Sequence, residues 1–163
     1  MIDDHVLVSV DLSFPSLRSP ELTDALGRAL ADAGLPSQCL SLEVTEASLE
    51  RDPTFAATLL EDRARLGVRL CLDDYGPERS TIGALSSHPF GTVKVGAATG
   101  ARTFTTVLGA ARAAGLETVA ERIETDEQLE AVRNLGCDAA QGFLFAAPGP
   151  APAVGRWLDS RKG

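Results

Sequence analysis

The sequence predicts an α/β protein, an incomplete β/α barrel with about six parallel strands. Strand-like and helix-like segments alternate and are joined by short connections, a pattern that favours a parallel sheet. Residues 68–72 are apolar almost throughout, as expected of a barrel strand buried on both faces. Acidic residues follow several of these strands, and the carboxyl ends of parallel strands meet on one face of a barrel.

The first half of the chain predicts three strands with helices between them. Ser19 and Pro20 suit the start of a helix, and Gly34 suits its end. An apolar face recurs at helical spacing between them. The expected elements, in order, are a strand over 6–10, this helix, a strand over 40–45, a helix opening at Asp52 and Pro53 and ending at Gly67, and a strand over 68–72.

The second half predicts three more strands. Thr125 and Gln128 form a capping-box pattern, which marks the start of a helix. The expected elements, in order, are a strand over 92–95, a helix over 104–114, a strand over 117–120, the capped helix up to residue 135, a strand over 139–143 and a short C-terminal helix containing Trp157 and Leu158.

The strand count falls short of a closed barrel, which has eight strands and about 250 residues. We therefore expect a single domain over residues 1–163 that lacks about two β/α units, including the first. Missing strands would leave open sheet edges, which proteins rarely leave in water. The sequence thus predicts a homo-oligomer or a partner protein that covers the gap.

Composition narrows the possible functions. With 15 basic and 23 acidic residues, the formal charge of −8 argues against binding to nucleic acid or to a membrane surface. The acidic N-terminus lacks the features of a signal peptide, and the sequence has no apolar run of membrane-spanning length. Three widely separated cysteines, Cys39, Cys71 and Cys137, suit buried thiols rather than a zinc site. These features predict a cytoplasmic protein.

Carboxylates recur where the predicted strands end. Such a cluster would repel itself unless protons or cations neutralised it, and hard divalent cations take oxygen ligands. A divalent-metal site is therefore the first hypothesis. The candidate residues are Asp11, Glu43, Asp73, Asp74 and Glu121.

The segments that carry these acids resemble the EAL family, the cyclic di-GMP phosphodiesterases. Residues 42–46 (LEVTE) look like the family's L-E-[IV]-T-E, and residues 72–76 (LDDYG) look like its L-D-D-F-G. Further matches, in the same order, are 10–13 (VDLS) to V-N-L-S, 93–95 (VKV) to L-K-I, 120–125 (AERIET) to A-E-G-V-E-T, 136–138 (GCD) to G-C-D and 141–143 (QGF) to Q-G-Y.

The resemblance implies a β/α barrel that cleaves cyclic di-GMP with two Mg²⁺ or Mn²⁺ ions. By that resemblance, Glu43 and Asp73 would be metal ligands, and Asp74 and Glu121 would bind the second ion or its waters. Asp11 stands at the family's asparagine and would keep an oxygen ligand. The residues implied for catalysis are Lys94, to orient the attacking water, Gln141, to hydrogen-bond in the site, and Glu46, to fix the loop after Asp74.

Departures from the family pattern bear on activity. The Glu-Ala-Leu signature is absent, and Arg122 replaces the glycine of A-E-G. Its guanidinium could pair with Glu121 or Asp74 and take the place of a metal. Three readings follow: a degenerate regulatory or interaction module with little or no hydrolysis, a working phosphodiesterase completed by another subunit or segment, and a cyclic di-GMP receptor that does not cleave its ligand.

Overall fold

A computed structural model describes residues 6–52, 60, 62–75 and 88–160 of the chain. Within these residues, six parallel strands form one sheet in the order of the sequence, as predicted. The strands are β1 (Val8–Asp11), β2 (Leu40–Thr45), β3 (Arg69–Asp73), β4 (Thr92–Gly96), β5 (Glu117–Glu121) and β6 (Ala139–Ala140).

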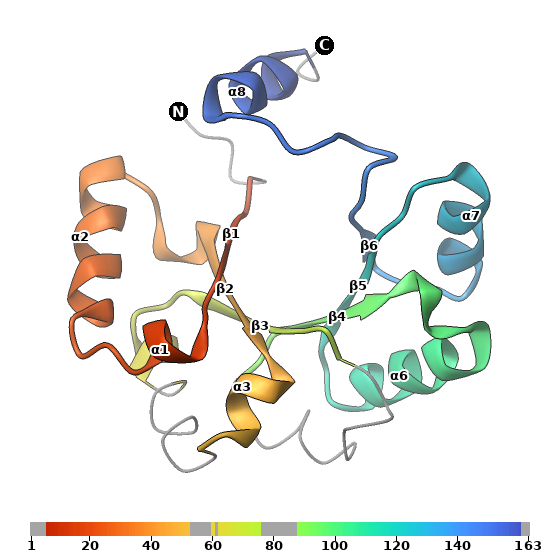
Figure 1. Cartoon of the computed structure of the whole chain (residues 1–163), viewed down its shortest axis with the longest axis horizontal. Helices are drawn as coiled ribbons and strands as arrows, with labels where there is room; N and C mark the ends of the chain where they lie inside the picture. The colour runs from red at the N-terminus through yellow and green to blue at the C-terminus, as the bar shows by residue number, and fades with distance from the viewer. Residues whose placement is uncertain (1–5, 53–59, 61, 76–87, 161–163) are drawn as a thin grey trace.

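Helices line the outer side of the arc that the strands describe (Figure 1). They are α1 (Phe14–Leu17), α2 (Leu22–Ala33), α3 (Glu46–Glu50), α6 (Ala101–Ala113) and α7 (Asp126–Asn134). Short 3₁₀ segments precede β2 and α6, at Ser37–Cys39 and Ala97–Thr99. This arrangement is an open β/α barrel, with the strands inside and the helices outside.

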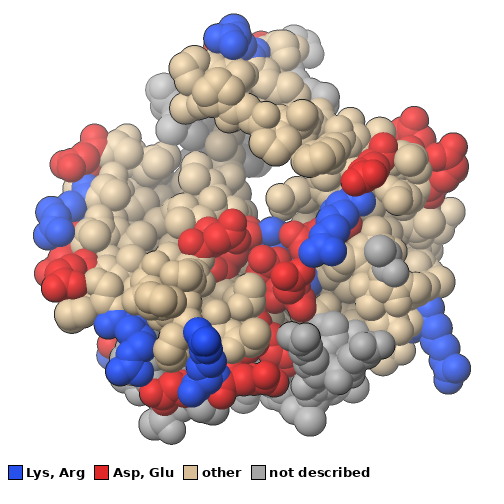
Figure 2. Space-filling view, in the orientation of Figure 1, with Lys and Arg blue, Asp and Glu red and all other residues tan. Residues whose placement is uncertain are grey.

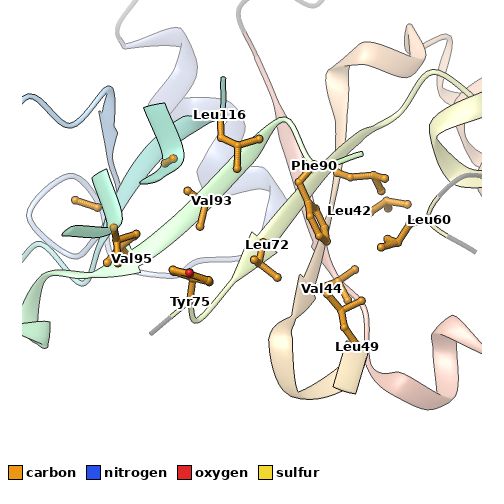
Figure 3. Packing of buried hydrophobic residues seen from close by; sticks show 14 of the residues in the cluster. Leu42, Val44, Leu49, Leu60, Leu72, Tyr75, Phe90, Val93, Val95 and Leu116 are labelled. Carbon is orange, nitrogen blue, oxygen red and sulfur yellow. The ribbon is translucent and has the colours of Figure 1, made fainter. Parts of the chain in front are cut away.

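Side-chain alternation along the strands divides them into two faces. Apolar side chains such as Leu42, Val44 and Leu72 pack together in the hydrophobic core (Figure 3). Val93 and Val95 of β4 belong to the same core and are fully buried. The residues between them therefore point to the other face of the sheet, inside the arc.

Several details differ from the sequence prediction, including the first strand, which covers Val8–Asp11 rather than residues 6–10. The helix expected to be capped by Ser19 begins at Leu22 with Glu21 as its N-cap, because the Ser19 hydroxyl instead donates a hydrogen bond to the Glu21 carboxylate. The last strand covers Ala139–Ala140 only, because the chain turns at Gly142. Cys137 is partly exposed rather than buried.

The helix expected to open at Asp52 and Pro53 falls largely on residues 53–59 and 61, outside the described part of the chain. Capping was predicted correctly at Thr125. Its hydroxyl accepts a hydrogen bond from the Gln128 backbone N–H, and its own backbone N–H donates one to Gln128 Oε1. Gly34 ends α2 in the left-handed conformation with φ 62°.

The arc is open between its edge strands, β1 and β6. Helix α8 (Ala151–Asp159) lies across this open side in Figure 1. Leu7, Val8 and Val10 at β1 are 45%, 42% and 38% exposed, so this edge carries uncovered apolar surface. No helix among the described residues combines the length and the apolar character that a bilayer crossing requires.

Candidate functional site

The acidic residues predicted as metal ligands gather at the carboxyl ends of the strands. Asp11 ends β1 directly beside Glu43 in the register of the sheet, and Asp73 ends β3. Glu121 ends β5 opposite Gly96, two residues beyond Lys94 of β4. The two-residue period places Lys94 and Glu121 on the same face of the sheet. Acidic side chains gather at the centre of the face seen in Figure 2.

Lys94 is the central cation of this cluster. Its Nζ donates a hydrogen bond to Glu43 Oε2 at 2.6 Å and lies 3.0 Å from Glu121 Oε1 and 3.9 Å from Asp73 Oδ1. Its side chain is 6% exposed. Burial acts to lower the pKa of Lys94, but the hydrogen bonds and charges of Glu43 and Glu121 outweigh it and raise the pKa. Lys94 is therefore a buried, permanently charged ammonium group shared by three carboxylates.

The acids form two groups that share Asp73. Carboxylate oxygens of Asp11, Glu43 and Asp73 lie within 4.8 Å of one another, and so do those of Asp73, Asp74 and Glu121. Oxygen donors at this spacing suit Mg²⁺ or Mn²⁺, so the residues present fit a two-ion centre with Asp73 as the shared ligand. These roles remain predictions of the donor chemistry.

Crowding of the carboxylates affects the pKa values of Asp11 and Glu121. Burial raises the pKa of Asp11, and the neighbouring Glu43 and Asp73 raise it further while Lys94 opposes them. Burial also raises the pKa of Glu121, against the hydrogen bond and charge of Lys94. The cluster therefore holds more negative charge than Lys94 alone neutralises, a condition under which a bound cation is favoured.

Arg122 contributes a second cation at the mouth of the site. Its Nη2 lies 3.1 Å from Asp74 Oδ1, and the two side chains are 67% and 62% exposed. The sequence left Glu121 and Asp74 open as partners of Arg122. In the structure the partner is Asp74, because Lys94 already holds Glu121.

Two predicted catalytic residues lie at the margins of the cluster. Glu46 is buried at the start of α3, just after β2. The loop that it was predicted to fix falls in residues 76–87, outside the described part of the chain. Gln141 has an exposed side chain, while its backbone bonds to β5 and to Ile123. It lines a hollow together with Glu121, Arg122 and Phe143.

Sequence reasoning missed two neighbours of the site. Phe143, 65% exposed, forms a wall of the hollow beside Arg122. Cys71 lies directly beside Glu43 in the register of the sheet. Burial, followed by the charge of Glu43, raises the pKa of Cys71 to about 12. Its position two residues before Asp73 was a usable signal, because strand residues two apart share a face.

The fold and the site together define an open β/α barrel with a carboxylate-rich centre at the carboxyl ends of its strands. The EAL domain family model matches residues 2–148, and the chain belongs to that family. The cyclic di-GMP phosphodiesterase RocR of Pseudomonas aeruginosa is 33% identical over 151 residues, covering 82% of this chain and 36% of RocR. Across eight curated relatives, the chain spans 20% to 36% of each relative's own length.

Solved structures agree with this assignment. The PaMucR phosphodiesterase in complex with c-di-GMP superposes with a TM-score of 0.83 at 30% identity, covering 91% of this chain and 70% of that one. The manganese/cy-diGMP complex of Klebsiella pneumoniae BlrP1 has a TM-score of 0.80 at 26% identity, covering 87% of this chain and 39% of that one. The chain is therefore an EAL domain of cyclic di-GMP signalling.

Proposed function

We propose that this EAL domain has little or no phosphodiesterase activity and acts as a regulatory or interaction module in cyclic di-GMP signalling. One observation carries the proposal. Arg122 stands where the family has glycine and places a protein cation against Asp74, so a side chain neutralises an acid that would otherwise be available to the second metal ion.

Charge stabilisation is the main contribution to this kind of catalysis. A bound pair of Mg²⁺ or Mn²⁺ ions supplies a hydroxide-like nucleophile and stabilises charge that develops on a phosphodiester. In a working site, Lys94 would orient the attacking water, Gln141 would hydrogen-bond within the site, and Glu46 would hold the neighbouring loop. Removing one ligand from such a centre lowers the rate by orders of magnitude, so a depleted centre retains little activity.

A second candidate is a working phosphodiesterase completed by another subunit or by sequence outside these 163 residues. The convergence of Glu43, Asp73 and Glu121 on Lys94 favours it. A third candidate is a receptor that binds cyclic di-GMP without cleaving it. The related PaMucR and BlrP1 structures are complexes with c-di-GMP, which favours binding of this nucleotide.

One experiment separates the three. The protein is incubated with cyclic di-GMP and Mn²⁺, binding is measured by calorimetry, and linear pGpG is quantified by chromatography. The proposed function predicts no pGpG above the level of an Asp73→Ala variant. Turnover that depends on Asp73 would establish the second candidate, and binding without turnover would establish the third.

The open side of the sheet is the proposed site of association with another protein chain. Apolar residues remain exposed along β1 and on α8, where Val154 and Trp157 are 50% and 38% exposed. The proposed module therefore associates through this side, either with a second copy or with a partner protein, as sheet edges in water usually require. Light scattering that gives a stable monomeric mass for the isolated chain would contradict self-association.

A further inference from the structure

Arg122 and Asp74 share an unusual backbone conformation. Their φ angles are 60° and 51°, and they are the only residues other than glycine with positive φ in the described part of the chain. A side chain disfavours this left-handed region, because Cβ approaches the following carbonyl. The backbone at residue 122 would therefore accept glycine with less strain than arginine.

Hydrogen bonds next to both residues hold the strained backbone in place. Tyr75 N–H donates to the Lys94 carbonyl at 3.3 Å, and Ile123 N–H donates to the Gln141 carbonyl at 3.1 Å. Asp74 N–H donates to Asp73 Oδ1 at 2.9 Å. The turns after β3 and β5 are thus fixed by their neighbours.

Every acid of the second carboxylate group now faces a cation of the protein. Asp74 faces Arg122 at 3.1 Å, while Glu121 and Asp73 face Lys94 at 3.0 and 3.9 Å. The first carboxylate group, formed by Asp11, Glu43 and Asp73, has fewer ion pairs with the protein's own cations. Among the described residues, its ion pairs run through Lys94 alone, and Asp11 at its outer side is exposed.

We propose that Arg122 is a built-in counter-cation that replaces one of two divalent ions, so that the chain binds a single ion through Asp11, Glu43 and Asp73. This inference rests on the proposed function in taking the carboxylates as a two-ion centre. Charges of +1 and +2 held about 5 Å apart in water repel enough to weaken binding of the second ion about tenfold. The ion pair with Asp74 also removes one of that ion's three ligands.

The test measures binding of Mn²⁺ alone to the protein. Calorimetry gives the number of ions bound per chain, and electron paramagnetic resonance shows whether two ions are coupled. The wild type should bind one ion per chain and give the spectrum of isolated Mn²⁺. Arg122→Asn removes the cation, and asparagine tolerates the left-handed backbone. The Arg122→Asn variant should bind a second Mn²⁺ ion about tenfold more tightly than the wild type does. The two ions should give the spectrum of a spin-coupled pair, because Asp73 belongs to both carboxylate groups. Arg122→Lys, which keeps a cation, should bind one ion.

A matched control is Arg65→Asn, which breaks another exposed arginine–aspartate pair, with Asp62 at 2.8 Å, outside the carboxylate groups. It should leave the stoichiometry at one. Arg122→Gly serves as a second variant if Arg122→Asn folds poorly, since glycine fits φ 60° without strain. Two ions in the wild type, or no second ion in a folded Arg122→Asn or Arg122→Gly protein, would overturn the assignment.

These results are independent of turnover. If the wild type releases pGpG yet binds one ion, the proposed lack of activity fails and the role of Arg122 stands. If the wild type is inactive and the charge-removing variants gain no second ion, the role of Arg122 fails alone.

Discussion

Replacing Lys94 by methionine should destabilise the fold in a strongly pH-dependent way. Methionine keeps the length of the buried stem but leaves Glu43 and Glu121, at 6% and 13% exposure, without their common partner. Removing one member of a buried ion pair costs about 3–5 kcal/mol, because a buried charge is left uncompensated. The buried carboxylates can escape that cost only by taking up a proton.

The free energy needed to protonate a buried carboxylate determines how much stability the variant loses at each pH. Glu121 starts from an ordinary pKa of 4.5, so protonating it at pH 7 costs about 3.4 kcal/mol, from 2.5 units at about 1.36 kcal/mol each. At pH 5 the same step costs about 0.7 kcal/mol. The hydrogen bond and charge of Lys94 act to lower the pKa of Glu121, so loss of Lys94 raises that folded-state pKa further, and the folded variant binds a proton more tightly than the unfolded chain. Its stability therefore rises as pH falls towards 4.5.

Urea denaturation in the presence of EDTA measures the effect. The loss of unfolding free energy should be about 3–4 kcal/mol at pH 7 and about 1 kcal/mol at pH 5. Lys94→Met combined with Glu43→Gln removes one of the stranded charges and should recover part of the loss at pH 7. An equal loss at both pH values, or no recovery in the double variant, would show that Lys94 does not neutralise these acids.

Three further predictions concern the scaffold. Thr125→Ala removes a capping box and should lower the unfolding free energy by about 1 kcal/mol in urea titration, and an unchanged midpoint would contradict the cap. In Gly142→Ala, a Cβ would collide with the Ile123 backbone, so thermal denaturation should show a clearly lower Tm, which wild-type behaviour would refute. Hydrogen bonds from Thr118 lower the pKa of Asp138, so its stabilisation is present above pH 3.8 and is lost below it. Acid titration of Asp138→Asn should therefore converge with the wild type at low pH, and a constant difference would refute this.

The sheet could be predicted from sequence because each strand is a short apolar run between turn residues. Leu40–Thr45 has the bounds that were expected, β4 and β5 each extend one residue further than expected, and β3 is shifted by one residue. The last strand was predicted too long. The expected strand ran on through Gln141 to Phe143, but Gly142 lies against the Ile123 backbone and turns the chain.

The sequence allowed the residues of the candidate site to be predicted, but not which acid pairs with Arg122. Strand-end positions and the family resemblance identified Glu43, Asp73 and Glu121, and parallel register brings them together. The partner of Arg122 depends on a left-handed turn at a residue that is not glycine. Residue preferences argue against that conformation, so the sequence offered Glu121 and Asp74 as partners of Arg122 without deciding between them.

A crystal structure of the protein with Mn²⁺, with the ions located by anomalous scattering, would show directly whether Arg122 stands in for one of two ions. We expect one anomalous peak among Asp11, Glu43 and Asp73, with the Arg122 guanidinium on Asp74. Two peaks that share Asp73, with Arg122 turned away from the acids, would contradict it.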